Sequence, residues 1–330
     1  MHSKPKLLIA DSASGKFLPR VLDRIDKNSF EISYPETEDE NSLIELAENV
    51  DAILCYQSNI SDKIISNSKS LKLIQKHGLN CKNIDIDAAR KKNIVISTQT
   101  LLRNITVAEQ ALSLIIACAR KLIPGHESVK NAVYLQKDVE PTKTSQWNIR
   151  PNWPELQDIT EVYGSSVGII GLGDIGMEIA KRCKAFGMDI SYYQRTRHTP
   201  ETETLYSATF SSFKDLIQQV DYLVLVIPHT KATEGLIGKK ELSLMKKNAT
   251  LINVGRGGLI QEVHLIEALR KKEIKMAGLD VYEIEPLPQS SPLIKLNNVV
   301  LLPHTGAGSN KHWDIDIPAS LKKIKDFFEN

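Results

Sequence analysis

Short apolar runs alternate with segments of helical period along most of this chain. Five such runs in the first hundred residues predict strands: Leu7–Ala10, Glu31–Tyr34, Ala52–Cys55, Lys72–Gln75 and Ile94–Ser97. The segments between them carry helix-start signals. Because strands that alternate with helices pair in parallel, the pattern predicts a doubly wound parallel α/β sheet.

Three helix starts are predicted between these strands. Pro19 fits the first position of a helix, where its missing N–H costs nothing. Ser42–Glu45 has the capping-box pattern, and Asp85 fits an N-cap. The acidic run Glu36–Glu40 is expected to be a solvated loop.

The second half of the chain opens with a complete strand–helix–strand unit. Val167–Ile170 predicts a strand, Met177–Phe186 a helix and Met188–Tyr193 a second strand. Gly187 stands where a helix commonly ends in glycine. Four more strands are predicted farther along: Tyr222–Ile227, Thr250–Val254, Met276–Val281 and Val299–Leu302.

Helices are predicted between and after these strands. Ser211 or Ser212 caps a short one, and Gln261–Lys271 forms another with Val263 facing inward. A last helix, Lys311–Phe328, is expected to be interrupted by its proline, Pro318. The chain therefore contains two successive α/β patterns.

One long helix separates the two patterns. Thr106–Glu109 is a second capping box, and the helix is expected to run to Leu122 before Pro124 and Gly125 end it. Apolar residues surround this helix almost completely, which predicts burial at a domain junction or a subunit interface. Residues 139–154 contain three prolines and two tryptophans without period and predict a long surface connection.

Composition narrows the function classes. The chain has 330 residues, which suggests two domains at about 150 residues each. A formal net charge of +2 without a basic tract gives no reason to expect nucleic acid. The longest apolar run, Ala111–Ala119, is far shorter than the ~20 residues of a membrane span, and Leu7–Ala10 is too short for a signal peptide. We therefore expect neither a membrane partner nor secretion.

Cysteine spacing argues against a metal site. The four cysteines, at positions 55, 81, 118 and 183, show no zinc or CxxC spacing. Thiols of this kind are typical of a reducing compartment, so a cytoplasmic location and no bound metal are expected.

The glycine motif that follows the strand at 167–170 predicts a dinucleotide site. Gly171 allows a tight turn, Gly173 lets backbone approach a pyrophosphate, and Gly176 lets the helix pack on the strand. The helix start at Asp174 and Ile175 directs N–H groups and the positive end of the helix dipole toward the phosphates. Its strand–turn–helix context raises this motif above a chance glycine turn.

The residues after the second strand bear on the choice of cofactor. An NAD site needs an acid there for the ribose 2′-hydroxyl, whereas this chain has Gln194, Arg195, Thr196 and Arg197. The missing negative charge and the two arginines predict a preference for NADP(H), with NAD(H) possible. The alternative is a solvated loop in which neutral Gln194 accepts both cofactors.

Three polar residues follow successive strands, where ligands bind in open α/β sheets. Arg256 offers a two-pronged clamp for a carboxylate, and His304 can pass a proton, since histidine is the side chain suited to proton transfer near neutral pH. Glu285 can orient the histidine ring. Each residue alone also fits an ordinary loop position, so their joint placement favours a catalytic set.

Several blocks carry a family resemblance. Four blocks resemble the signature motifs of the D-isomer-specific 2-hydroxyacid dehydrogenases, and two earlier ones resemble the family's N-terminal block: Gly171–Gly176, Asn253–Gly257, Ala277–Pro286 and Leu302–Gly306, then Ile74–Gly78 and Asn83–Asp85. The resemblance implies a Rossmann nucleotide-binding domain, residues 104–303, inserted into a flavodoxin-like substrate domain, residues 1–103 and 304–330.

The resemblance also assigns roles. It implies that Arg256 binds the substrate carboxylate, that His304 is the acid/base and that Glu285 is its partner. Asp280 would orient the nicotinamide carboxamide, and Pro228, which ends a strand, would join the cofactor site.

The same resemblance places backbone N–H groups of Gly78 and Leu79 on the substrate carboxylate. This loop departs from the family pattern, since Asn80 replaces a second glycine and Lys82 replaces an acid. Gln261 stands where an aspartate is common, with little expected consequence.

The expected activity is hydride transfer between NADP(H) and a small 2-keto or D-2-hydroxy acid, with glyoxylate or hydroxypyruvate as leading substrates and a homodimer as the working form. One alternative is a D-3-phosphoglycerate dehydrogenase, because Lys82 and Arg103 can meet an extra phosphate. Another is a dinucleotide-sensing corepressor of the same fold. The chain stops at Asn330 directly after its last helix, and we expect this lack of a tail to favour the enzyme.

Overall fold

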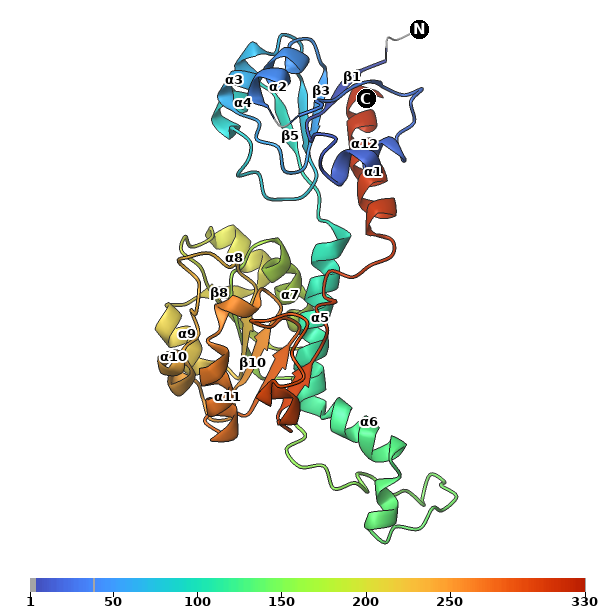
Figure 1. Cartoon of the computed structure of the whole chain (residues 1–330), viewed down its shortest axis with the longest axis vertical. Helices are drawn as coiled ribbons and strands as arrows, with labels where there is room; N and C mark the ends of the chain where they lie inside the picture. Colours follow the sequence, from blue (N-terminus) through green and yellow to red (C-terminus); the bar gives the residue numbers. More distant parts are fainter. Residues whose placement is uncertain (1–3, 38, 330) are drawn as a thin grey trace. The chain divides into compact units, whose positions relative to one another are not determined.

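The structure is a computed structural model that describes residues 4–37 and 39–329 (Figure 1). The chain forms two compact units. The first extends up to Ile105 and resumes at Ser309, and the second is Thr106–Gly308.

The first unit contains a five-stranded parallel sheet in the order β2-β1-β3-β4-β5. Its strands are β1 (Lys6–Ile9), β2 (Glu31–Ser33), β3 (Ala52–Cys55), β4 (Leu73–Lys76) and β5 (Val95–Ser97). Its helices are α1 (Phe17–Leu22), α2 (Glu40–Ala47), α3 (Asp62–Asn67), α4 (Ile86–Lys91) and α12 (His312–Glu329). All five strands predicted for this region are confirmed.

Helices cover both faces of this sheet. Buried residues of α2, α3 and α4 form one core with the sheet, and those of α1 and α12 form the other. Pro318 lies inside α12 and does not interrupt it, contrary to prediction. Ile317, Leu321 and Ile324 of α12 are buried in this core, and their packing holds the helix through the missing N–H.

Two helix starts in the first unit differ from the prediction. Helix α1 begins at Phe17, so Pro19 is its third residue. Helix α2 is capped by Asp39, whose carboxylate accepts from Ser42 N at 3.1 Å, and not by Ser42 itself. The acidic run is therefore partly helical, because Glu40 begins α2. Negative charge is favoured at this end of a helix by the helix dipole. Glu38 lies outside the described residues. Asp85 caps α4 as predicted.

The second unit contains a seven-stranded parallel sheet in the order β12-β11-β10-β9-β6-β7-β8. Its strands are β6 (Ser166–Ile170), β7 (Asp189–Tyr193), β8 (Ala208–Phe210), β9 (Tyr222–Leu225), β10 (Thr250–Asn253), β11 (Met276–Leu279) and β12 (Val299–Leu301). The sequence missed β8, a strand of three residues. The two parallel sheets with interleaved helices confirm the predicted α/β fold class.

The helices of the second unit lie on both faces of its sheet. They are α5 (Leu102–Arg120, which begins in the first unit), α6 (Leu122–Lys130), α7 (Asp174–Ala185), α8 (Pro200–Tyr206), α9 (Phe213–Gln219), α10 (Lys239–Leu244) and α11 (Glu262–Arg270), with short 3-10 turns η1 (Val133–Gln136), η2 (Gly257–Leu259) and η3 (Pro292–Lys295). Helices α5 and α7 pack on one face, and α9, α10 and α11 pack on the other.

Helix α5 starts four residues before the predicted capping box. Leu102 N donates to the Asp316 carboxylate at 2.9 Å, so the cap comes from α12 and Thr106 lies inside the helix. Among the described residues α5 is long and apolar enough to cross a membrane by length and composition, but 56% of that window is buried inside the protein. A mostly buried core helix meets the same criteria of length and composition.

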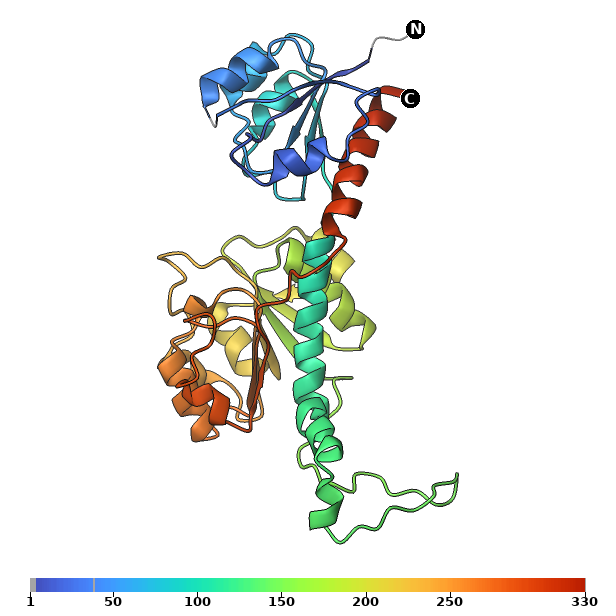
Figure 2. The same cartoon turned by 45° about the vertical axis from the view of Figure 1, so that its right-hand side comes forward.

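An extended arm, which consists of α6 and the loop that follows it, comes after α5. Lys121 adopts a left-handed conformation, and α6 continues through Pro124 and Gly125, which were wrongly predicted to end the helix. Pro124 is the third residue of α6, where no helical N–H bond is required. Figures 1 and 2 show α6 and the following loop extending away from the sheet of this unit.

One residue predicted to face inward does not. Val263 is 74% exposed, because α11 turns Leu265, Ile266 and Leu269 inward. Gly187, with φ of +70°, and the Ser212 cap of α9 are as predicted.

Candidate active site

The glycine turn between β6 and α7 is built for close backbone approach. Gly171 has φ of +102°, and a Cβ there would lie 2.5 Å from Ile227 Cγ2. A Cβ on Gly176 would lie 2.1 Å from the Gly171 carbonyl oxygen. A Cβ on Gly173 would meet nothing within 4 Å. The first two glycines are required by the fold, and the third leaves an open cradle.

Helix α7 starts at this cradle. Gly173 is its N-cap, and Met177 N donates to Gly173 O at 2.8 Å. Asp174 and Ile175 form the first turn, where backbone N–H groups and the helix dipole favour an anion. These residues fit the pyrophosphate of a dinucleotide.

The loop after β7 contains the residues expected to select the cofactor. Gln194 Nε2 donates to Thr196 O at 2.6 Å, which tightens the loop. Arg197 is held by two parallel bonds of 2.8 Å to the Glu203 carboxylate. Arg195 is exposed and makes no hydrogen bond or ion pair within the described residues. The two arginines therefore differ in their availability to a ligand.

Glu203 is a residue that the sequence did not indicate. Hydrogen bonds from Arg197 and from the Tyr192 hydroxyl lower the pKa of Glu203 to about 2, so it stays ionised. Tyr192 Oη donates to Glu203 at 2.8 Å and accepts from His198 N. The His198 ring in turn contacts Leu172 O at 2.7 Å, which ties this loop to the glycine turn.

Pro228 follows β9, the strand that pairs with β6. Thr233 donates to Pro228 O at 2.8 Å and accepts from Thr230 N at 2.8 Å. Pro228 therefore lies in an ordered turn at the same sheet edge as the glycine motif.

Buried Asn253 shapes the turn that carries Arg256. Its amide donates to Arg256 O at 2.9 Å and accepts from Gly255 N at 3.1 Å. A Cβ on Gly257 would lie 1.7 Å from Tyr282 O, so this turn packs directly on the loop that leads to Glu285. The Arg256 guanidinium donates to Gly255 O at 2.6 Å.

Glu285 and His304 form a hydrogen-bonded pair. Glu285 Oε2 lies 2.6 Å from His304 Nδ1, and Oε1 accepts from Tyr282 N at 3.0 Å. Burial acts to raise the pKa of Glu285, but the hydrogen bonds from His304 and Tyr282, with the charges of His304 and Arg256, hold it below its usual value. A carboxylate only accepts, so Nδ1 carries a proton, and Nε2 is the ring nitrogen that remains for proton transfer.

Asp280 lies at the end of β11 and is 2% exposed. One oxygen accepts from Gln110 at 2.9 Å and from Thr305 N at 3.0 Å, and the other accepts from Gly306 N at 2.8 Å. The carboxylate thus holds the backbone beside His304.

One pocket unites the predicted catalytic residues. Arg256, Glu285 and His304 line a cavity of about 650 Å³, together with His229 and Gln261. His229 was not predicted, and its ring lies against Gly258, where a Cβ would come within 2.5 Å of it. The sequence offered no signal for His229 beyond its position after β9.

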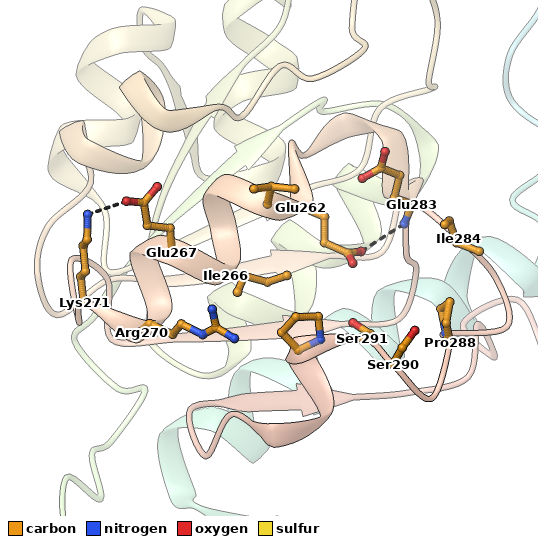
Figure 3. A pocket seen from close by; sticks show the side chains of 12 residues that line it. Glu262, Ile266, Glu267, Arg270, Lys271, Glu283, Ile284, Pro288, Ser290 and Ser291 are labelled. Carbon is orange, nitrogen blue, oxygen red and sulfur yellow. Dashed lines mark hydrogen bonds and ion pairs between the residues drawn. The ribbon is translucent and has the colours of Figure 1, made fainter.

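A second cavity of about 610 Å³ lies beside α11, between that helix and the loop 283–292 (Figure 3). It shares Glu262, Val263 and Glu283 with the first pocket, and Glu283 N donates to the Glu262 carboxylate at 3.3 Å. It contains none of the predicted catalytic side chains, so the chemistry belongs to the first pocket.

Gly78 and Leu79 lie in the first unit, just after β4. Gly78 has φ of +125°, and its carbonyl accepts from Gln99 N at 3.1 Å. The Arg103 guanidinium lies 5.0 Å from the centre of the Tyr56 ring in the same unit. Within the described residues no group of three or more histidine, cysteine, aspartate or glutamate side chains is placed to hold a metal ion.

The glycine cradle, the helix start and the paired histidine define a dinucleotide-dependent α/β dehydrogenase. Residues 112–306 match the family model described as the NAD-binding domain of D-isomer-specific 2-hydroxyacid dehydrogenases. The chain is 36% identical over 310 residues to a glyoxylate reductase of Pyrococcus horikoshii, covering 93% of this chain and 87% of the relative.

Two further relatives extend the comparison. A D-3-phosphoglycerate dehydrogenase of Methanocaldococcus jannaschii is 32% identical, covering 93% of this chain and 54% of the relative. The crystal structure of an NADPH-dependent glyoxylate/hydroxypyruvate reductase of Sinorhizobium meliloti matches with a TM-score of 0.59 and 26% identity, covering 98% of this chain and 94% of that one. The protein therefore belongs to the D-isomer-specific 2-hydroxyacid dehydrogenase family and is an oxidoreductase that uses a nicotinamide dinucleotide.

Proposed function

We propose that this protein reduces a small 2-keto acid, glyoxylate or hydroxypyruvate, to the corresponding 2-hydroxy acid with NADPH, and that the product from hydroxypyruvate is the D isomer. The observation that carries the proposal is the 2.6 Å contact between His304 and Glu285 in a pocket that Arg256 also lines. An acid/base group and a carboxylate clamp are the two protein functions that this reaction requires.

Each catalytic residue has a separate part. Arg256 binds the substrate carboxylate. A bound reduced nicotinamide would supply the hydride, with its electron pair, for the carbonyl carbon. Protonated His304 gives the Nε2 proton to the carbonyl oxygen, which becomes the hydroxyl, and Glu285 stabilises the charged ring and fixes its orientation.

Each group of cofactor-binding residues likewise has a separate part. Gly171, Gly173 and Gly176, with Asp174 and Ile175, receive the pyrophosphate. Asp280 and Pro228 contact the nicotinamide half.

For the adenosine 2′-phosphate we propose Gln194, Arg195, Thr196 and Arg197, with exposed Arg195 as the principal contact. The NADPH dependence of the Sinorhizobium relative supports this choice. A phosphate that meets a charged guanidinium gains a charge-assisted bond, whereas the 2′-hydroxyl of NADH does not.

We propose a cytoplasmic homodimer with residues 1–103 and 304–330 as the substrate domain and 104–303 as the dinucleotide-binding domain. Support for the dimer comes from the arm, whose large apolar side chains are between 48% and 89% exposed: Leu122, Ile123, Val129, Leu135, Trp147 and Ile149. Exposed apolar groups in such number favour a protein partner.

A second candidate is oxidation of D-3-phosphoglycerate. The Methanocaldococcus relative favours it, and Arg103 and Lys82 of the first unit would supply the extra positive charge for the phosphate.

The test is a panel of 2-keto acids scored by the loss of NADPH or NADH absorbance. D-3-phosphoglycerate is assayed beside it in the oxidative direction, by the gain of that absorbance from NADP+ or NAD+. We expect glyoxylate or hydroxypyruvate to give the highest kcat/KM, with NADPH preferred. His304→Ala should lower kcat by roughly 10²–10⁴ with the affinity for NADPH nearly unchanged. Highest efficiency for D-3-phosphoglycerate would select the second candidate, and no turnover of any acid would overturn both.

A further inference from the structure

The loop that carries His304 has an unusual backbone. His304 has φ of +54°, in the left-handed region that side chains seldom adopt. Such a conformation persists only where the surroundings hold it. Thr305 N and Gly306 N, directly after His304, both donate to the Asp280 carboxylate, at 3.0 and 2.8 Å. Asp280 is therefore the anchor of the catalytic loop.

A side chain from a distant helix completes this anchor. Gln110 of α5 donates from Nε2 to Asp280 at 2.9 Å and to the Thr305 hydroxyl at 3.1 Å. Because a carboxylate only accepts, the amide nitrogen of Gln110 must face it. Gln110 thus links Asp280 to the loop through Thr305, the residue that follows His304.

Packing makes Gln110 a fixed support. Its neighbour Ala111 and Leu114, one turn further along α5, are fully buried in the core of the second unit. A Cβ on Gly306 would lie 2.9 Å from Asp280 and 3.6 Å from Gln110, so the loop lies directly against both. Because the core holds α5 in place, Gln110 presents its amide to the loop at a fixed position. A side chain on a solvated, mobile segment would not do so.

We infer that Gln110 is a positioning residue for His304, acting through Asp280 and Thr305. The inference rests on the proposed function, since it assigns to His304 the proton transfer described above. Without the Gln110 amide, Asp280 and the loop each lose one hydrogen bond, and the imidazole samples positions away from the carbonyl oxygen. Proton transfer depends steeply on such placement.

The first test is Gln110→Met, which keeps the length of the side chain and removes the donor. We expect kcat for the keto acid to fall about tenfold, with KM for NADPH changed by less than about threefold. Ser113→Ala, an exposed position on the same helix, is the matched control and should keep wild-type kcat. A fall in NADPH affinity with normal kcat would overturn the inference, because Gln110 would then act on the cofactor.

The second test separates positioning from a general structural role. On a His304→Gln background, adding Gln110→Met should change the residual turnover by less than about twofold, because there is no imidazole left to position. A further tenfold loss on that background would contradict the inference.

A third measurement is independent of turnover. Nitrogen-15 spectra of the histidine side chains should show the His304 resonances broadened or shifted in Gln110→Met, with those of His264 unchanged. Unaltered His304 resonances would overturn the positioning role. If the wild type reduces no keto acid, the proposed function fails while these spectra still decide whether Gln110 holds the ring.

Discussion

At the scale of single residues, the two oxygens of Glu285 have different partners. One faces the His304 ring at 2.6 Å, and the other accepts from the Tyr282 backbone at 3.0 Å. The backbone bond fixes the carboxylate before it meets the ring. The Tyr282 hydroxyl reaches Leu302 O at 2.8 Å, so the same residue also ties together the two loops that carry the pair.

Glu285→Gln should lower stability in a pH-dependent way. The folded pKa of Glu285 lies below its ordinary value of 4.5, so its ionised form stabilises the folded state above that pH. The contribution is lost as pH falls through the folded pKa. Thermal midpoints of wild type and variant should therefore differ at neutral pH and converge as the pH falls through the lowered folded pKa of Glu285. A gap that widens on acidification would contradict this account.

Arg256→Lys should raise the KM for the keto acid and lower kcat/KM by about tenfold or more, although the charge is kept. A lysine ammonium cannot form the two parallel bonds that a guanidinium makes with a carboxylate. Steady-state kinetics measure the effect, and Lys271→Arg, an exposed position on the surface near α11, serves as control. Wild-type kinetics in Arg256→Lys would mean that the carboxylate is held elsewhere.

The two arginines after β7 should contribute unequally to the choice of cofactor. Arg195→Ala removes an exposed cation and should weaken NADPH by about 10- to 150-fold, at roughly 1.5–3 kcal/mol for a charge-assisted bond. Arg197→Ala should cost less, because Glu203 already occupies its guanidinium through two bonds. The comparison is made by the ratio of kcat/KM for NADPH and NADH. A larger loss for Arg197→Ala, or a wild-type preference for NADH, would refute this order.

At the scale of elements, the strand–turn–helix from β6 to α7 separates structural from binding glycines. Gly171 and Gly176 touch each other across the turn, because the helix passes over the end of the strand. Gly173 borders open space at the helix start. Identical substitutions in this one turn should therefore have different consequences.

Gly176→Ala places a methyl 2.1 Å from a carbonyl oxygen and should lower the Tm by about 3–10 °C. Gly173→Ala meets no neighbour and should leave the Tm unchanged, while weakening NADPH binding about tenfold or more where the pyrophosphate approaches. Thermal unfolding and cofactor titration of both variants provide mutual controls. Equal loss of stability in the two would argue against these separate roles.

At the scale of the whole molecule, the arm after α5 stands out because it exposes large apolar side chains that its sequence would favour burying. Trp147 is 89% exposed, and Leu135 is 72% exposed. Such side chains lower the free energy when a partner covers them, at roughly 25 cal/mol per Å² of apolar area. A second copy of the chain is the partner that we propose.

Sedimentation should therefore give about twice the chain mass of 36.9 kDa. Leu135→Ser combined with Trp147→Ser should shift the equilibrium toward the monomer. Leu205→Ser, which alters an exposed leucine of α8 outside the arm, is the matched control and should leave the dimer intact. A monomeric wild type at working concentration would refute the assembly.

Local patterns in the sequence predicted much of this protein. The glycine motif, the Asp85 and Ser212 caps and the Gly187 helix end all depend on neighbours within a few residues, and each is found as predicted. Arg256, Glu285 and His304 line one pocket because parallel strands end at one edge of a sheet, while their catalytic roles stay predictions. Alternation of strands and helices was sufficient to predict that edge.

Tertiary structure alone decided the contacts between distant segments. The start of α5 depends on Asp316, which lies 214 residues away, and Arg197 is paired with Glu203 of a helix that the sequence did not predict. Gln110 reaches Asp280 across 170 residues. A hydrogen bond between side chains depends on the final positions of both elements. Short-range periodicity specifies each element but not the packing that brings such partners together.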